Sequence, residues 1–117
     1  MDTKKILENI QEFRKISPRI HSQTISVFLY VAINEGKQGV PMTSIENFTK
    51  LSQSSVSRNV ALLSKWSGIA DKDKKIRKPG LDFVETFEDP MERRRKLVRL
   101  TAKGKRVHNT LIDLIGN

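Results

Sequence analysis

The sequence predicts a single, mostly helical domain with a small β-hairpin near its C-terminal end. Three observations predict this fold class. Five segments carry apolar residues at helical spacing, and two apolar stretches with strand character flank a turn at Asp89-Pro90. The chain of 117 residues is long enough for one domain, residues 1–117, with a modest core of its own. It has no cysteine, which excludes disulfides, thiol redox sensing and any cysteine-ligated zinc site.

The positive charge of the chain is concentrated in its second half. The net charge is +9, and residues 53–106 carry fifteen Lys or Arg against seven Asp or Glu, whereas residues 1–52 carry seven against five. A localised basic field indicates a polyanionic partner, either nucleic acid or an anionic membrane surface, with general solubility as the alternative. No apolar run approaches the ~18 residues of a membrane span, and the N-terminal segment lacks the apolar core of a secretion signal. We therefore expect a cytoplasmic protein that is not an integral membrane protein.

Two helices are predicted in the first third of the chain. Residues 2–16 place Ile6, Leu7, Ile10 and Phe13 on one face of a helix. A Ser-Pro break follows, and the next helix ends near Gly36, with apolar residues nearly all round. That density predicts a central, mostly buried helix. The segment "KQGVP" after it is expected to be a turn.

Two further helices, joined by a short polar break, form a candidate helix-turn-helix unit. The first is predicted over 42–51, with Thr43 as N-cap and Glu46 completing a capping box. The second is predicted over 53–66, is capped by Ser52 or Ser54, and should expose Ser54, Ser55, Ser57, Arg58 and Asn59. Small hydroxyls permit close approach to a duplex, while arginine and asparagine can bond guanine and adenine in a major groove. The alternative is an ordinary helical hairpin whose serines face water.

A basic hairpin follows the helix-turn-helix unit. Residues 69–80 are expected to form a flexible basic loop, and residues 82–100 a strand, a turn and a return strand. Its tip and return arm carry Arg93, Arg94, Arg95 and Lys96, and a last helix capped by Thr101 comes next. This order is that of a winged helix-turn-helix domain, with the hairpin as the wing. The planar guanidinium group of arginine can bond two phosphate oxygens at once and fits a narrow minor groove. Because each neutralised phosphate releases counterions, DNA binding should weaken steeply with salt.

Two motifs stand out in the helix-turn-helix unit and the wing. The wing carries the pattern DP-x-[DE]-RR…V-x-LT-x-x-G, and the start of the second of the two helices carries "S-x-V-S-R"; the matching residues are Asp89, Pro90, Glu92, Arg93, Arg94, Val98, Leu100, Thr101, Gly104, Ser54, Val56, Ser57 and Arg58. By these motifs, the region of roughly residues 20–106 resembles the MarR family of bacterial and archaeal transcription regulators. The resemblance implies a dimeric winged-helix protein that binds a palindromic operator, usually as a repressor. It also implies that residues 55 and 57–59 read DNA, that Arg93 to Arg95 contact the backbone or minor groove, and that Asp89 forms a salt bridge with a nearby arginine.

The chain departs from the family pattern at two places. Residues 70–79 look like an insertion before the wing, which either grips flanking DNA or is only tolerated. The C-terminal part is short, so residues 1–18 and 102–117 are expected to form the dimerisation helices and residues 19–101 the DNA-binding part. The dimer residues would be Ile6, Leu7, Ile10, Phe13, Leu111, Ile112, Leu114 and Ile115. Alternatively, the two terminal helices only cap the core of a monomer.

The predicted function is that of a sequence-specific, double-stranded DNA-binding regulator that acts as a dimeric repressor, as the family resemblance implies. The alternative is a DNA-architecture or replication-initiation protein of a virus or plasmid. The complete set of expected DNA contacts is Thr43, Ser44, Gln53, Ser54, Ser55, Ser57, Arg58, Asn59, Lys65, Arg93, Arg94, Arg95 and Lys96.

Trp66 is expected in the core, with stacking on a base as the alternative. The two isolated histidines indicate no metal site, and no catalytic arrangement is visible, so neither an enzyme nor a cofactor is expected. Nothing identifies a small-molecule effector.

Overall fold

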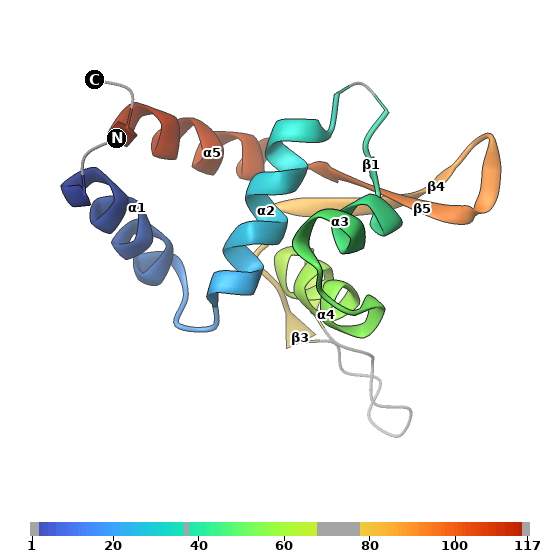
Figure 1. Ribbon diagram of the computed structural model, residues 1–117, viewed down its shortest axis with the longest axis horizontal. Helices are drawn as coiled ribbons and strands as arrows, with labels where there is room; N and C mark the ends of the chain where they lie inside the picture. The colour runs from blue at the N-terminus through green and yellow to red at the C-terminus, as the bar shows by residue number, and fades with distance from the viewer. Residues whose placement is uncertain (1–2, 37, 68–77, 116–117) are drawn as a thin grey trace.

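The computed structural model describes residues 3–36, 38–67 and 78–115 (Figure 1). Its helices in these ranges are α1 (Thr3–Ile16), α2 (Ser22–Asn34), α3 (Met42–Thr49), α4 (Gln53–Leu63) and α5 (Ala102–Ile115). Its strands are β1 (Val40–Pro41), β2 (Trp66–Ser67), β3 (Lys78–Pro79), β4 (Val84–Asp89) and β5 (Glu92–Leu100). The fold class predicted from the sequence is therefore confirmed. No helix in these ranges is long and apolar enough to cross a membrane.

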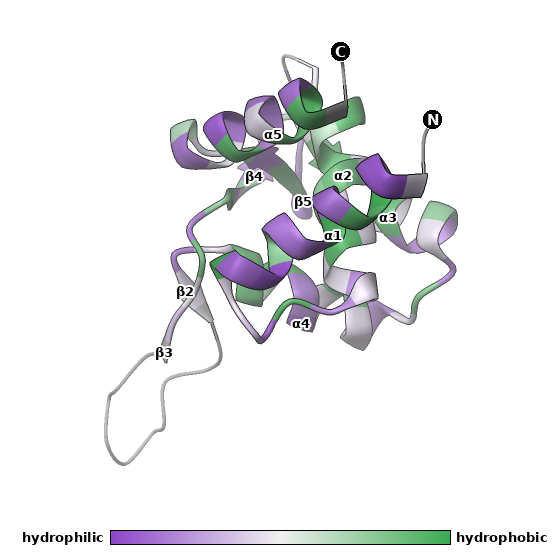
Figure 2. Cartoon of the chain, turned by 90° about the vertical axis from the view of Figure 1, so that its left-hand side faces the viewer, coloured by the Kyte–Doolittle hydropathy of each residue, from purple (hydrophilic) through white to green (hydrophobic). Residues whose placement is uncertain are grey.

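The core is built around α2, as its apolar composition predicts. Phe28 of α2 is fully buried, and its ring lies 5.9 Å from that of Phe13 in α1 and 5.7 Å from that of Phe83 ahead of β4. Such edge-on and tilted ring pairs add to the stability gained from burying apolar surface. Figure 2 shows α2 as a mainly hydrophobic helix between α1 and the sheet. One helix therefore joins the N-terminal helix, the wing and α4 into a single body.

Three strands form the sheet of the wing, in the order β1-β5-β4. All neighbours are antiparallel, with Val40 opposite Val98 and Val84 opposite Leu100. The expected turn at "KQGVP" is thus wrong at its end, because Val40 and Pro41 pair with β5. A two-residue strand that includes a proline has no periodicity for a sequence to reveal, and only its partner makes it a strand.

The helix-turn-helix unit is present, with corrected boundaries. α3 begins at Met42, and the backbone of Pro41 occupies its N-cap, so Thr43 lies inside the helix rather than at its cap. Lys50 ends α3 in the left-handed conformation, with φ of 62°. α4 then begins after Ser52, whose Oγ accepts a hydrogen bond from the Ser55 backbone N–H at 3.1 Å, as a good N-cap does.

The second helix is shorter than the predicted 53–66. α4 ends at Leu63, and Trp66 lies in β2, paired with Pro79 of β3. The backbone N–H groups of residues 80–83 donate to the carbonyl oxygens of residues 62–65, at 2.7–3.2 Å. The returning chain thus takes the carbonyl groups of Leu62 and Leu63, which a longer helix would need for its own hydrogen bonds. Trp66 is half-exposed and so is not the core residue that was expected. Most of the predicted insertion, residues 70–77, lies outside the described residues.

Candidate nucleic-acid interface

The first turn of α4 presents a connected group of hydroxyls and one arginine. The Ser52 hydroxyl donates to Ser55 Oγ at 3.0 Å, and the Arg58 guanidinium donates to the same Ser55 Oγ at 3.2 Å. Ser54, Ser57 and Arg58 are exposed, whereas Ser55 is half-buried. The prediction that these side chains point away from the core is therefore consistent with the structure. Arg58 is held against the helix by a hydrogen bond that a nucleic-acid acceptor can replace.

Asn59 does not join this exposed group, and the expectation that its side chain is exposed is wrong. Its residue is only 9% exposed. Its amide Nδ2 donates to the Ser55 carbonyl at 2.9 Å, and its Oδ1 accepts from the Thr24 hydroxyl of α2 at 2.6 Å. The side chain points from α4 toward α2, and both ends of its amide are already bonded within the protein.

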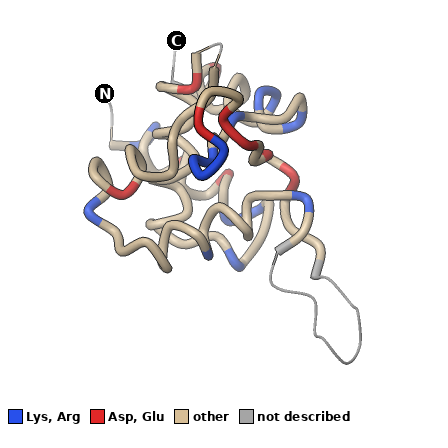
Figure 3. The backbone as a smooth tube through the Cα atoms, turned by 90° about the vertical axis from the view of Figure 1, so that its right-hand side faces the viewer, with Lys and Arg blue, Asp and Glu red and all other residues tan. Residues whose placement is uncertain are grey.

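The arginines of the wing lie in an interruption of the β4–β5 ladder. The pairing steps from Glu88 opposite Lys96 directly to Asp89 opposite Glu92, so residues 93–95 have no partner residue on β4. An irregularity of this kind bends a strand and redirects its side chains. All four cations from residue 93 to residue 96 are exposed. Figure 3, which faces the wing, shows them as one continuous basic segment.

Asp89 organises the tip of the wing in two ways. One carboxylate oxygen accepts from the Met91 backbone N–H at 2.9 Å, and the other lies 3.9 Å from Arg95 Nε. The first contact closes the turn, and the second is the aspartate–arginine salt bridge that the family resemblance implied. Arg95 is thus anchored at the base of the tip.

The helix and the wing meet at one hollow of about 360 Å³. It is lined by side chains from α3, α4 and β5, namely Met42, Thr43, Glu46, Gln53, Ser57, Arg94, Arg95 and Lys96. Six of these were expected to contact DNA. The structure brings them together although they are spread over more than fifty positions of the sequence. Glu46 and Met42 also line the hollow. The capping-box pattern predicted only a capping role for Glu46, so its place here was missed.

Other predicted contacts lie outside this hollow. Ser54, Ser55, Arg58 and Arg93 are absent from its lining, although they belong to the same α4 turn and the same basic segment. Ser44 is half-buried on α3. Lys65 was predicted to lie in the helix over 53–66, but it lies beyond the end of α4 and is exposed.

The terminal helices α1 and α5 pack on each other at the end of the molecule opposite the tip of the wing (Figures 1 and 2). Ile6, Leu7, Ile10 and Ile112 are exposed there, and Leu114 is half-buried. Phe13 and Leu111 are instead buried within the chain, so their assignment to a dimer surface is wrong. Both helices therefore cap the core with some apolar residues while leaving others exposed. The side chain of Ile115 lies outside the described residues.

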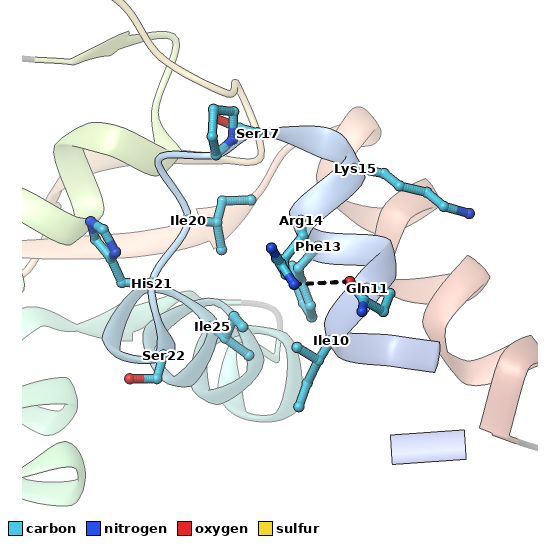
Figure 4. A pocket seen from close by; sticks show the side chains of 11 residues that line it. Ile10, Gln11, Phe13, Arg14, Lys15, Ser17, Ile20, His21, Ser22 and Ile25 are labelled. Carbon is cyan, nitrogen blue, oxygen red and sulfur yellow. Dashed lines mark hydrogen bonds between the residues drawn. The ribbon is translucent and has the colours of Figure 1, made fainter. Parts of the chain in front are cut away.

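A larger hollow of about 780 Å³ lies where α1 joins α2 (Figure 4). Apolar side chains of Ile10, Phe13, Ile20 and Ile25 line it, and Arg14 lies at it with a hydrogen bond to Gln11 Oε1 at 3.3 Å. Its lining residues come from α1, α2 and the segment between them, and none comes from α4 or the wing. Within the described residues, no three His, Cys, Asp or Glu side chains gather to hold a metal ion.

Comparison with known proteins finds structural relatives only. No protein-family model and no curated sequence matches the chain. Among solved structures, MepR of S. aureus bound to an oligodeoxyribonucleotide superposes with a TM-score of 0.72 at 13% identity, over 97% of this chain and 69% of that one. PcaV of Streptomyces coelicolor, in complex with its natural ligand, gives 0.61 at 20% identity, over 91% and 63%. A MarR mutant of E. coli complexed with operator DNA gives 0.60 at 16% identity, over 97% and 69%.

These neighbours are regulators of the MarR family, and their likeness extends over nearly the whole described chain. The chain spans about two thirds of the length of these three proteins. At such low identity, the superpositions establish the fold and leave the activity to be argued from the site. The fold that the sequence resemblance implied is confirmed: this chain has the winged-helix fold of MarR-family transcriptional regulators.

Proposed function

We propose that this protein is a sequence-specific, double-stranded DNA-binding transcriptional regulator that acts as a dimeric repressor. The observation that carries the proposal is the shared hollow between α4 and the wing, where polar side chains of α3 and α4 face the cations of β5. A helix that presents hydroxyls and an arginine suits the ~12 Å wide major groove. Basic side chains beside it suit the phosphates that flank the same groove.

In this arrangement α4 and the wing bind different parts of the duplex. α4 enters the major groove with Ser54, Ser57 and Arg58 toward the bases, and Thr43 and Gln53 stand at its edge. The wing lies along the backbone or in the adjacent minor groove, where Arg93, Arg94 and Lys96 neutralise phosphates. Two of the structural neighbours were solved bound to DNA, which supports this assignment for a chain of the same fold.

The dimer is proposed from the terminal helices. Ile6, Leu7 and Ile10 of α1 and Ile112 of α5 expose large apolar side chains at the end where the two helices pack on each other. A second copy that covers this surface would give a two-fold assembly with two α4 helices. Such a dimer reads two half-sites about one helical turn of DNA apart, ~34–36 Å, so the operator should be palindromic.

The proposal is tested by selection from a random duplex pool, followed by footprinting of the chosen sequence. One protected palindrome that overlaps a promoter supports a regulator. Tandem repeats at a replication origin, or broad coating of DNA, would support the DNA-architecture or replication-initiation alternative. Anionic lipid vesicles serve as the control for a general affinity for polyanions. Enrichment of no sequence over the starting pool would contradict sequence-specific binding.

A further inference from the structure

A buried polar pair joins α2 to α4 in a part of the core that is otherwise apolar. Thr24 is fully buried, and its hydroxyl lies 2.6 Å from Asn59 Oδ1. The Ser55 carbonyl, 2.9 Å from Asn59 Nδ2, can only accept a hydrogen bond, so the amide group must face it. The Thr24 hydroxyl therefore donates to Oδ1, and it accepts from the His21 backbone N–H at 3.4 Å. Every donor and acceptor of this hydrogen-bond network is therefore assigned without conflict.

This network ends in the turn of α4 that faces outward. Asn59 holds the backbone of Ser55, and the Ser55 hydroxyl accepts from both Ser52 and Arg58, at 3.0 and 3.2 Å. Two hydrogen bonds thus separate the Thr24–Asn59 contact from the Arg58 guanidinium. A displacement of Asn59 would move the backbone on which Arg58 depends.

Apolar packing alone specifies the orientation of α4 weakly. Val56, Val60 and Leu63 supply its buried face, and side chains of this kind retain contact after small rotations or shifts. A hydrogen bond loses its strength when its geometry changes, and a buried group left without a partner is costly. A buried polar pair can therefore select one register among several apolar ones.

We propose that Thr24 and Asn59 are positioning residues that set the orientation of the first turn of α4 and thereby its discrimination between DNA sequences. The inference rests on the proposed function. It assigns Asn59 a role that needs no contact with DNA. It also separates specificity from the general attraction of the wing for phosphates, because neither residue carries charge.

The decisive variant replaces both partners together. Thr24→Val with Asn59→Leu fills the site with apolar groups of similar size, so that neither member of the buried pair is left without its partner. The His21 backbone N–H loses the Thr24 hydroxyl as acceptor, but His21 is exposed to water. We expect this double variant to stay folded and to bind a scrambled duplex within about twofold of the parent, because its charge is unchanged. Its preference for the selected duplex over the scrambled one should fall about tenfold, comparable to the cost of one mismatched base pair.

Val60→Ala is the matched control. It removes buried volume from α4 next to Asn59 and lowers stability, yet it leaves the polar pair intact. Its sequence preference should stay within about twofold of the parent, if the preference depends on the pair and not on stability alone. Thermal unfolding of all variants establishes that each is folded at the temperature of the binding assay.

The outcomes distinguish a failure of the positioning role from a failure of the proposed function. A folded double variant with the parent's preference overturns the inference and leaves the proposed function standing. An equal loss of preference in Val60→Ala also overturns it, because loss of stability would then suffice. Should the double variant fail to fold, Thr24→Ser, which keeps the hydroxyl, must retain the parent's preference while Thr24→Val loses it; equal preferences overturn the inference. A parent that prefers no duplex removes the proposed function and the inference together.

Discussion

Replacement of Arg94 by alanine should flatten the salt dependence of DNA binding. Arg94 is exposed, lines the hollow beside α4, and lies where the β4–β5 ladder is interrupted. Among the described residues, no carboxylate lies within ion-pair distance of it, in contrast to Arg95, which has Asp89. Its positive charge is therefore available to a phosphate. Binding of that phosphate releases condensed counterions, which makes the contact sensitive to salt.

The size of the effect follows from one lost phosphate contact per protomer. Each contact contributes about −0.9 to the slope of log affinity against log salt, so the slope should become shallower by about 0.9 per protomer and about 1.8 per dimer. From 50 to 200 mM salt, the parent should therefore lose about twelvefold more affinity than the variant as a dimer. The deficit of the variant is largest at low salt and nearly independent of the DNA sequence.

Fluorescence anisotropy with a labelled duplex, measured across that salt range, gives both slopes. Arg106→Ala is the matched control, because it removes the same charge from an exposed position on α5, which lies away from α4 in Figures 1 and 2. Its slope should equal that of the parent. An unchanged slope in Arg94→Ala, or equal flattening in both variants, would refute the assignment of the wing to phosphate contact.

Three further outcomes are expected. Arg58→Ala should cost about 1–3 kcal/mol on the selected duplex and little on a scrambled one; equal losses on both would show that Arg58 does not read sequence. Leu7→Glu, which places a charge on the exposed face of α1, should sediment as a monomer at micromolar concentration, and an unshifted dimer would exclude that face as the interface. Gly104→Ala should lower Tm by ~4 °C or more, since the added Cβ would lie 2.0 Å from the Phe83 carbonyl oxygen; an unchanged Tm in calorimetry would contradict that crowding.

The sequence predicted the five helices and the two long strands of the wing in their order, because each of these elements has a local signal. The apolar helix predicted at the centre became α2, which supplies Val27, Phe28 and Val31 to the core, and Asp89-Pro90 marked the turn of the wing. Thr101 was recognised as the N-cap of α5, and its Oγ1 accepts from the Gly104 backbone N–H at 3.0 Å. Each of these features depends on neighbours within a few positions, which is the range over which a pattern can be read.

The errors arose where a distant part of the chain decides the outcome. α4 ends early because residues 80–83 bond its last carbonyl groups. Asn59 turns inward because Thr24, thirty-five positions earlier, offers it a hydroxyl. Val40 is in a strand only through its partner Val98. Helical spacing alone cannot reveal any of these contacts, and an asparagine beside Arg58 is as compatible with a groove as with a core.

The short β2–β3 ladder has a consequence for engineering. Trp66 faces Pro79 and Ser67 faces Lys78 across the ladder, so the polypeptide between them departs and returns at adjacent points on a folded platform. A replacement segment need only bridge one strand spacing of ~4.8 Å, and doubling its length costs only about 0.6 kcal/mol in closure entropy. The β2–β3 ladder would hold both ends of such a segment, which makes this position a graft point for a reporter peptide or a donor fluorophore.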